Sequence, residues 1–261
     1  MQGSSAALTP RFAVITGAAG GIGQAMVQEF AANGYTVIAT DRGPAPEGLE
    51  AHHYLQADLA RTVTDEAYAE EVFSQIKTWL GSAGLAALIN NAAVQILGGA
   101  DSLTRNDWQQ TLNVNLVAPF IWTQALLPAL EQAKGSVVNI SSIHAKLTKK
   151  NFVAYATSKA ALSGMTRAMA VDLGPRVRVN AIEPAAIETE MLKTGFEGKP
   201  ELYSRLQECH PARRIGLPAE VARLAVLLVD KNIAFVHGAC ISIDGGIGNA
   251  LLEPTDPADV L

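Results

Sequence analysis

The chain has 261 residues, 49% of them hydrophobic, which is enough apolar material for one large α/β domain or two smaller ones. Its net charge is -5 at pH 7, and its largest basic cluster is only Lys146, Lys149 and Lys150, which argues against a nucleic-acid partner. Two cysteines, Cys209 and Cys240, are too few for a disulfide framework, and no Cys/His cluster has metal-ligand spacing. We therefore expect no metal and a reducing, cytoplasmic compartment.

The two ends of the sequence show no targeting signal. Residues 1–10 lack the charged and apolar regions of a secretory leader, and residues 251–261 are acidic with two prolines. We expect both ends to be flexible, or the tail to pack on a neighbouring subunit. The most apolar long window, residues 112–130, is interrupted by two asparagines and two prolines, so we expect no membrane anchor.

The first predicted unit is a strand, a glycine turn and a helix. Residues 11–16 (RFAVIT) form an apolar run, and residues 24–33 have apolar side chains at helical spacing. The glycines between them allow a tight turn and a close approach of the backbone to a pyrophosphate, which the helix N-terminus then faces with free N–H groups. The residues that we expect to bind a dinucleotide here are Gly17, Gly21, Ile22 and Gly23.

A second predicted strand, residues 35–40, ends at Asp41, eighteen residues after Gly23. This is near the spacing at which a carboxylate binds the adenosine ribose hydroxyls, where it would repel a 2′-phosphate. Arg42 could attract that phosphate instead, but Gly20 stands where a basic residue would strengthen the attraction. We expect both Asp41 and Arg42 to line the cofactor site and NAD to be preferred over NADP. A plain turn at Asp41 is compatible with this interpretation.

Strands and helices continue to alternate through the first half of the chain. Residues 52–56 and 84–89 predict the third and fourth strands, and residues 64–80 predict a helix that covers the sheet. Small side chains after the fourth strand would let a nucleotide lie close to the backbone. The nucleotide contacts that we expect from these two strand ends are Asp58, Leu59, Asn91 and Ala92.

Residues 103–131 predict a long helical region with Asn113 and Asn115 among apolar neighbours. An amide inside such a helix needs a hydrogen-bonding partner. Asn115 is therefore of more interest than a surface asparagine.

The strongest chemical signal lies in the middle of the chain. Residues 136–140 predict a buried strand that leads to Ser142, and residues 153–173 predict a helix with Tyr155 and Lys159 one turn apart on one face. A phenol titrates near pH ~10, so accepting a proton near neutrality requires a shift of about three units, or ~4 kcal/mol. A nearby ammonium favours that shift. Because a tyrosine and a lysine at this spacing also occur on ordinary amphipathic helices, the pair indicates a catalytic site only if the chain has a cofactor site as well.

The last part of the chain completes the alternation. Residues 176–182 and 239–243 predict the last two strands, and residues 218–230 predict a helix. Residues 191–211 are polar and suit either a lid over the substrate or a plain surface insertion. Since sites in such sheets lie at the carboxyl ends of strands, three further residues are expected near the cofactor: Pro184, Ile187 and Thr189.

No internal repeat or linker interrupts this order, so we expect a single domain over residues 1–261. Right-handed crossovers would assemble it into a Rossmann-like α/β fold, a doubly wound parallel sheet with helices on both faces.

Taken jointly, these motifs resemble those of the short-chain dehydrogenase/reductase family, in its single-domain branch of about this length. The resemblance covers nearly the whole chain. In the first half of the chain, the matching segments are T-G-x-x-x-G-I-G at residues 16–23, N-N-A at residues 90–92 and NVNL around Asn115. In the middle, Ser142 stands thirteen residues before Tyr155, and Y-x-x-x-K ends at Lys159. The last segments are N-A-I-x-P at residues 180–184 with Thr189, and D-G-G at residues 244–246.

The chain departs from the family pattern at a few positions. Ala93 and Ala185 replace glycines, and each adds a methyl group near the nicotinamide half of the site, which would tighten a loop or narrow the substrate entrance. Glu183 is unusual for its position. It is either a substrate contact or a structural hydrogen-bond acceptor.

The resemblance implies an NAD(H)-dependent oxidoreductase that interconverts a secondary alcohol and a ketone. Tyr155 would exchange the alcohol proton while hydride moves to or from the nicotinamide. Lys159 would lower the phenol pKa and hold the nicotinamide ribose, and Ser142 would bind the substrate oxygen. Asn115 would keep a helix bend and a water that relays protons.

The partners expected are a small-molecule substrate and further copies of the chain. The family's usual interface helices correspond to residues 103–131 and 153–173, which implies a homo-oligomer, either a tetramer or a dimer. The polar set expected around the pocket favours a hydroxylated substrate such as a sugar or polyol derivative, although an apolar substrate beneath the lid is an alternative. These polar residues are Gln95, His144, Lys146 and Glu183.

Two other classes of protein are alternatives to an oxidoreductase. One is a catalytically silent nucleotide-binding regulatory or scaffold protein of the same fold, against which the intact Ser142, Tyr155 and Lys159 argue. The other is a nucleotide-sugar epimerase or dehydratase, which would need an added substrate domain.

Overall fold

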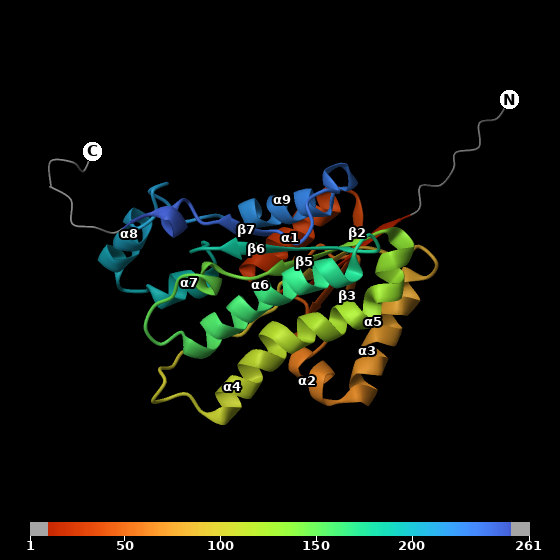
Figure 1. Cartoon of the computed structure of the whole chain (residues 1–261), viewed down its shortest axis with the longest axis horizontal. Helices are drawn as coiled ribbons and strands as arrows, with labels where there is room; N and C mark the ends of the chain where they lie inside the picture. The colour runs from red at the N-terminus through yellow and green to blue at the C-terminus, as the bar shows by residue number, and fades with distance from the viewer. Residues whose placement is uncertain (1–9, 252–261) are drawn as a thin grey trace.

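Seven parallel strands form the central sheet of the computed structural model, which describes residues 10–251 (Figure 1). The predicted flexible ends lie outside the described residues, apart from Pro10 and Leu251. The strand order β3-β2-β1-β4-β5-β6-β7 is the doubly wound arrangement predicted from the sequence. The strands are β1 (Arg11–Thr16), β2 (Tyr35–Asp41), β3 (His53–Gln56), β4 (Leu85–Asn90), β5 (Ser136–Ile140), β6 (Arg178–Pro184) and β7 (Cys240–Ile243).

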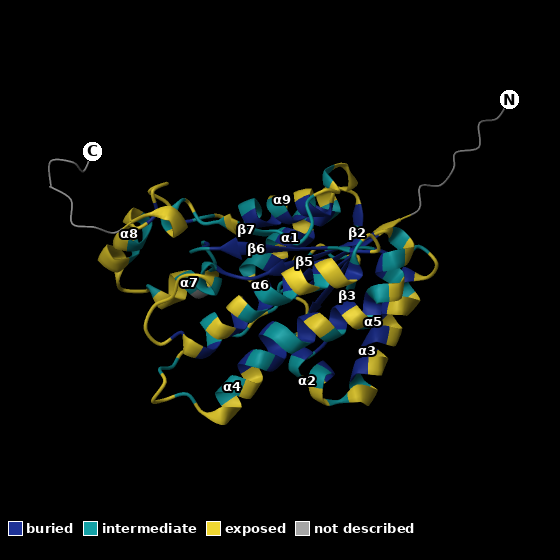
Figure 2. Ribbon diagram, viewed as in Figure 1, coloured by how far each residue is buried: buried dark blue, intermediate teal, exposed yellow. Residues whose placement is uncertain are grey.

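Strand β1 illustrates how the chain builds a core on each side of the sheet. Successive side chains of a strand point to opposite faces, so Phe12 and Val14 enter one buried cluster while Ala13 and Ile15 enter the other. All residues of β1 except Arg11 are buried. This two-sided burial explains why the strand reads as a continuous apolar run. Figure 2 shows the same concentration of buried residues along the strands.

Helices cover both faces of the sheet, as Figure 1 shows. One face carries α1 (Gly21–Ala32) and α9 (Pro218–Val229). The other carries α2 (Leu59–Thr64), α3 (Glu66–Leu80), α5 (Ala118–Ala133) and α6 (Val153–Leu173). The remaining helices are α4 (Arg105–Leu112), α7 (Glu190–Gly195) and α8 (Pro200–Glu208), and short 3₁₀ turns span Ile143–Ala145, Lys231–Ile233 and Ile247–Asn249.

The long helical region predicted for residues 103–131 is confirmed, but a π-helical turn (Asn113–Val117) breaks its α-helical pattern between α4 and α5. At the centre of this turn, the side chain of Asn115 leaves its own helix to bond the backbone of Val94. Pro119 follows at the start of α5 and has no N–H to extend the previous ladder. The break thus comes from a tertiary contact that no local pattern records.

The helix predicted for residues 64–80 is also interrupted. Asp65 lies between α2 and α3, and its side chain accepts a hydrogen bond from the N–H of Tyr68, which caps α3. Smaller boundary differences occur elsewhere: α1 begins at Gly21 rather than at residue 24, and β6 extends to Pro184. No helix within residues 10–251 is long and apolar enough to cross a membrane.

The start of α9 is held by an ion pair between Arg214 and Glu220. The two guanidinium nitrogens donate to the two carboxylate oxygens at 2.7 and 2.6 Å, and the N–H of Leu217 donates to the same carboxylate at 2.8 Å. Hydrogen bonds from Arg214 are the largest cause that lowers the pKa of Glu220 to about 2. A carboxyl group with a pKa lowered on folding stabilises the native state above its ordinary pKa.

We predict that Glu220→Gln lowers the free energy of unfolding by about 1 kcal/mol at pH 7, a value kept small because the pair is partly exposed. Since the folded pKa lies below the unfolded one, the difference from wild type should be complete above pH 4.5 and shrink as the pH falls toward 2. Urea unfolding of the variant and the wild type at pH 7, 4 and 3 measures this difference in the free energy of unfolding.

The matched control is Glu190→Gln, whose carboxylate is 88% exposed and pairs only with Lys193 and its neighbours on the surface. It should change the free energy of unfolding by no more than a few tenths of a kcal/mol. A Glu220→Gln effect that stays constant from pH 7 to pH 3 would contradict the electrostatic explanation.

Candidate active site

The glycine turn after β1 lies at the carboxyl edge of the sheet, where the N-terminus of α1 begins. Gly17 has a φ of +66°, and a Cβ added there would come within 2.7 Å of Cα of Ala92. A Cβ on Gly23 would overlap the carbonyl of Gly17, and one on Gly21 would come within 3.1 Å of Thr189. The turn therefore requires glycine at Gly17 and Gly23. It also brings segments from three parts of the chain together.

Thr16 and Asn91 tie the ends of β1 and β4 to each other. The hydroxyl of Thr16 accepts hydrogen bonds from the N–H groups of Asn91 and Ala92, both at 3.1 Å. In return, the Asn91 side chain donates to the carbonyls of Thr16 and Gly17, both at 3.0 Å. Asn91 thus supports the glycine turn with its amide nitrogen. Thr16 was not among the predicted site residues, and its position at the end of an apolar strand is the signal that could have identified it.

Asp41 ends β2 beside the glycine turn. One carboxylate oxygen accepts a hydrogen bond from the N–H of Ala19 at 2.9 Å, and the other accepts one from the N–H of Arg42 at 2.7 Å. The side chain of Arg42 is exposed. No side chain caps the start of α1 at Gly20, so its first-turn N–H groups are left without a capping partner. These N–H groups and the Asp41 carboxylate lie at the same carboxyl edge of the sheet. This arrangement fits a dinucleotide.

The residues expected after β3 have mainly structural contacts. Asp58 caps α2 by accepting hydrogen bonds from the N–H groups of Ala60 and Arg61 at 2.9 and 3.4 Å. The side chain of Leu59 is 7% exposed and belongs to the core. Only the backbone of Leu59 is therefore left to contact a nucleotide. Ile22 is half-buried at the start of α1 and packs against the core on the other face of the sheet.

The segment after β6 approaches the glycine turn from the other side. Thr189 caps α7 by accepting a hydrogen bond from the N–H of Leu192 at 3.3 Å, and it contacts the space in front of Gly21. Ile187 is 6% exposed and packs into the core. Pro184 is buried at the end of β6, where the N–H of Ala185 donates to the carbonyl of Ile243.

Asn115 joins the loop after β4 to helix α6. Its side chain accepts a hydrogen bond from the N–H of Val94 at 2.8 Å, and its amide nitrogen donates to the Val94 carbonyl at 2.9 Å and to Ser158 Oγ at 3.0 Å. The residue is fully buried. It therefore fixes the position of α6, which carries Tyr155 and Lys159, relative to β4.

Ser142, Tyr155 and Lys159 meet at the carboxyl end of β5. The Ser142 hydroxyl lies near the Tyr155 phenol and acts to lower its pKa. The ammonium of Lys159 lies 5.7 Å from the centroid of the Tyr155 ring and donates to the carbonyl of Ile140 at 2.7 Å. Lys159 is 2% exposed, so the lysine reaches the phenol from inside the protein.

The pKa values at this site correct one expectation from the sequence. Burial raises the pKa of the Tyr155 phenol, and the nearby Ser142 hydroxyl opposes this only in part. Burial also lowers the pKa of Lys159 to about 7. Burial therefore acts on the phenol more strongly than Lys159 does, because the lysine is itself desolvated and is bonded to a carbonyl.

His144 and Phe152 form a wall beside Tyr155. The imidazole of His144 stacks on the ring of Phe152 with centroids 4.5 Å apart, and it meets the ring of Tyr155 edge to face at 5.8 Å. Burial, followed by the charge of Lys149, lowers the pKa of His144, so the imidazole is neutral at pH 7. Sequence reasoning did not identify Phe152. An aromatic residue immediately before the helix of Tyr155 was the available signal.

The other polar residues expected around the pocket are spread out. Gln95 and Ala93 are exposed in the loop after β4. Glu183 is 1% exposed and accepts hydrogen bonds inside the protein, so of the two alternatives only the structural acceptor fits. Lys146 lies with its ammonium 2.7 Å from that carboxylate.

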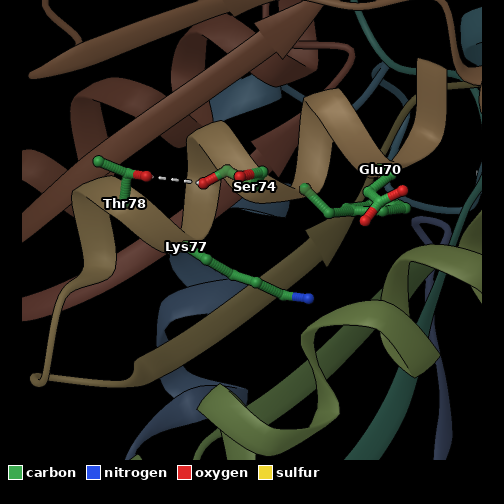
Figure 3. Close-up of a pocket in the computed structure, with 5 residues that line it drawn as sticks. Glu70, Ser74, Lys77 and Thr78 are labelled. Carbon is green, nitrogen blue, oxygen red and sulfur yellow. Dashed lines mark hydrogen bonds between the residues drawn. The ribbon is translucent and has the colours of Figure 1, made fainter. Parts of the chain in front are cut away.

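Two hollows in the described surface lie apart from these residues. The larger, of about 470 Å³, runs along the outer side of α3 and is lined by a single helix (Figure 3). The smaller, of about 90 Å³, lies beneath the segment after β6, beside His210 and Asp244. Because neither borders Tyr155, the candidate site is defined by the convergence of its polar groups rather than by the size of a cavity.

Comparisons with known proteins agree with this arrangement. A family model described as Enoyl-(Acyl carrier protein) reductase matches residues 17–248. Protein FixR of Bradyrhizobium diazoefficiens is 35% identical, over 91% of this chain and 86% of its own length. NAD-dependent glycerol dehydrogenase of Listeria innocua is 32% identical, over 92% of this chain and 94% of its own length.

Solved structures show the same relationship. The ligand-free aldohexose dehydrogenase of Thermoplasma acidophilum superposes with a TM-score of 0.88 at 29% identity, covering 95% of this chain and 98% of that one. Other solved relatives contain bound NADP or NADH. The chain therefore belongs to the short-chain dehydrogenase/reductase family and is an oxidoreductase.

Proposed function

We propose that this protein is an NAD(H)-dependent oxidoreductase that interconverts a secondary alcohol and a ketone, with Tyr155 as the general acid and base. The observation that carries the proposal is the meeting of Ser142, Tyr155 and Lys159 at the carboxyl edge of the sheet, the edge that also carries the glycine turn. The nicotinamide, when bound, supplies hydride transfer. The protein's own residues bind the alcohol and move its proton.

Each site residue has a role that its contacts support. The Ser142 hydroxyl, which lies near the Tyr155 side chain, would hold the substrate oxygen within reach of the phenol. The phenol Oη takes the alcohol proton in oxidation and returns it in reduction. Lys159 would bind the nicotinamide ribose with the ammonium protons that Ile140 does not use. Asn115 holds α6 in position relative to the loop after β4.

We propose NAD rather than NADP as the preferred cofactor. The fixed carboxylate of Asp41 would accept hydrogen bonds from the adenosine ribose and repel a 2′-phosphate. The glycerol dehydrogenase relative is NAD-dependent by name, which supports the same preference.

The substrate that we propose is a polar, hydroxylated small molecule. A neutral His144 beside Tyr155 can donate or accept hydrogen bonds to hydroxyl groups. Relatives named glycerol, D-threitol and aldohexose dehydrogenases act on molecules of this kind by their names.

We also propose a cytoplasmic homo-oligomer without a nucleic-acid or membrane partner. Cys209 and Cys240 are free thiols, in agreement with a reducing compartment. Apolar side chains project from the two expected interface helices: Phe120 on α5 is 41% exposed, and Val153 and Val171 on α6 are 40% and 85% exposed. Burial against another copy would remove this surface from water.

Tyr155→Phe should lower turnover by at least about 10²-fold, because the substrate proton loses its acceptor. The substrate is first identified by screening polyols and sugars with NAD and following NADH absorbance. Binding of NADH, measured by fluorescence, should change by less than about twofold, since the phenyl ring keeps the shape of the site.

The control for this variant is Tyr35→Phe, at the start of β2 on the opposite edge of the sheet, where the ring packs against Phe30. It should keep wild-type turnover. Undiminished turnover in Tyr155→Phe would exclude the proposed acid–base role. A wild-type protein that binds NADH yet oxidises no alcohol would favour the silent, nucleotide-binding alternative.

Asp41→Ala should lower the ratio of kcat/KM with NAD to kcat/KM with NADP by about tenfold or more, corresponding to ~1.4 kcal/mol. The variant loses both the ribose acceptor and the repulsion of a 2′-phosphate. Glu47→Ala, an exposed carboxylate in the following loop, is the control and should leave the ratio unchanged. A wild-type enzyme that prefers NADPH would refute the cofactor proposal directly.

Sedimentation velocity at micromolar concentration should show a dimer or tetramer. Val171→Asp, which places a charge on the most exposed of the three apolar side chains, should shift the distribution toward smaller species. The control is Thr78→Asp, on the exposed side of α3, which is not one of the two expected interface helices. A wild-type protein that sediments only as a monomer would contradict the proposal.

A further inference from the structure

Glu183 is a buried carboxylate directly behind the candidate active site. It lies in β6, is 1% exposed, and accepts a hydrogen bond from Ser163 Oγ at 2.8 Å through one oxygen. Its other oxygen lies 2.7 Å from the ammonium of Lys146. A buried carboxylate is costly unless it is paired and hydrogen-bonded. Both conditions are met here by residues from two other segments of the chain.

On its inner side, Glu183 is connected to the backbone of the site. Ser163 Oγ lies 2.9 Å from Ser141 Oγ, which in turn donates to the carbonyl of Lys159 at 2.9 Å. Ser141 is the residue before Ser142. Two hydroxyl groups therefore connect the carboxylate to the segments that carry Ser142 and Lys159.

On its outer side, Glu183 holds the end of the turn that begins at Ser142. This turn contains the 3₁₀ segment Ile143–Ala145, and the N–H of Lys146 donates to the carbonyl of Ile143 at 3.0 Å. The side chain of Lys146 is 58% exposed, yet its ammonium reaches the buried carboxylate. The close contact with the Glu183 carboxylate is the largest cause that raises the pKa of Lys146, so the ammonium stays charged throughout the neutral range.

The turn held in this way carries His144 against the catalytic tyrosine. Its imidazole contacts the rings of Phe152 and Tyr155. Within the turn, the N–H of His144 donates to Ser142 Oγ at 3.2 Å. A shift of Lys146 away from Glu183 would therefore move both the wall of the pocket and the partner of the Ser142 hydroxyl.

We propose that Glu183 and Lys146 form an ion-pair clamp that positions residues 142–146 over Tyr155 and so shapes the substrate pocket. Both are positioning residues, since they act through Ser142 and His144. The kinetic part of this inference rests on the proposed function, whereas the conformational part does not.

The conformational test uses hydrogen–deuterium exchange of the full-length protein. Lys146→Met keeps the length of the side chain but removes its charge, and the amides of residues 143–147 should exchange about tenfold faster. Lys146→Arg should restore slow exchange, because a guanidinium can pair with the same carboxylate. Lys150→Met, an exposed lysine four residues further on, is the control and should leave exchange unchanged.

The kinetic test separates positioning from general stability. Lys146→Met should raise KM for the alcohol found in the screen by about five- to tenfold and change kcat and KM for NAD by less than about twofold. Glu183→Gln keeps an acceptor for Ser163 but loses the charge, and it should have the same effect. The double variant Glu183→Gln/Lys146→Met should be no worse than either single variant, because the pair acts as one unit.

The outcomes distinguish the clamp from the proposed function. Unchanged exchange in Lys146→Met, or faster exchange spread over the whole chain, would overturn the clamp even if the enzyme is active. Additive effects of the two substitutions on KM would overturn it as well. A wild-type protein without activity would refute the proposed function, while local loosening of residues 143–147 would still support the clamp.

Discussion

The constraint on which the site depends is the connection between the ends of β1 and β4. These strands are neighbours at the centre of the sheet. From β1 the strand order continues to β2 and β3 on one side, and from β4 it continues to β5, β6 and β7 on the other. The hydroxyl of Thr16 accepts two N–H groups from the segment after β4, and the Asn91 amide returns two hydrogen bonds. This exchange brings the two backbones so close that Gly17 has no room for a side chain. The glycine turn after β1 and the loop after β4 are therefore joined as one unit.

Helix α6 is fixed to that unit by polar groups along its buried face. Ser158 accepts a hydrogen bond from Asn115, and the carbonyl of Lys159 accepts one from Ser141. Two turns further on, Thr166 accepts a hydrogen bond from Asn139, whose own oxygen accepts one from Asn90 of β4. A helix held only by apolar contacts could slide slightly, whereas directional hydrogen bonds at several successive turns fix its register. The spacing between Tyr155 and the sheet edge follows from these bonds.

Much of the fold could be predicted because it depends on local patterns. The bounds of β1, β5 and α6 agree with those expected from apolar runs and helical spacing. The π-helical turn between α4 and α5 could not be predicted from local patterns, since it accompanies the contact of Asn115 with Val94, twenty-one residues away; only the family resemblance implied a helix bend at Asn115. The pairing of Lys146 with Glu183 is equally hidden, because β6 brings the carboxylate back to the turn only in the folded sheet.

The same limit applies to the acid–base properties of the site. The sequence places a lysine one turn after a tyrosine, and from this alone the ammonium should favour the phenolate. Burial acts on both groups in the opposite sense, raising the pKa of Tyr155 and lowering that of Lys159 to about 7. Burial thus favours the neutral phenol and leaves Lys159 about half protonated near pH 7. Any bound group that presents negative charge or hydrogen-bond acceptors to Lys159 would stabilise its ammonium and, through it, the phenolate. Proton transfer at Tyr155 is therefore coupled to what occupies the site, and the residues alone do not determine it.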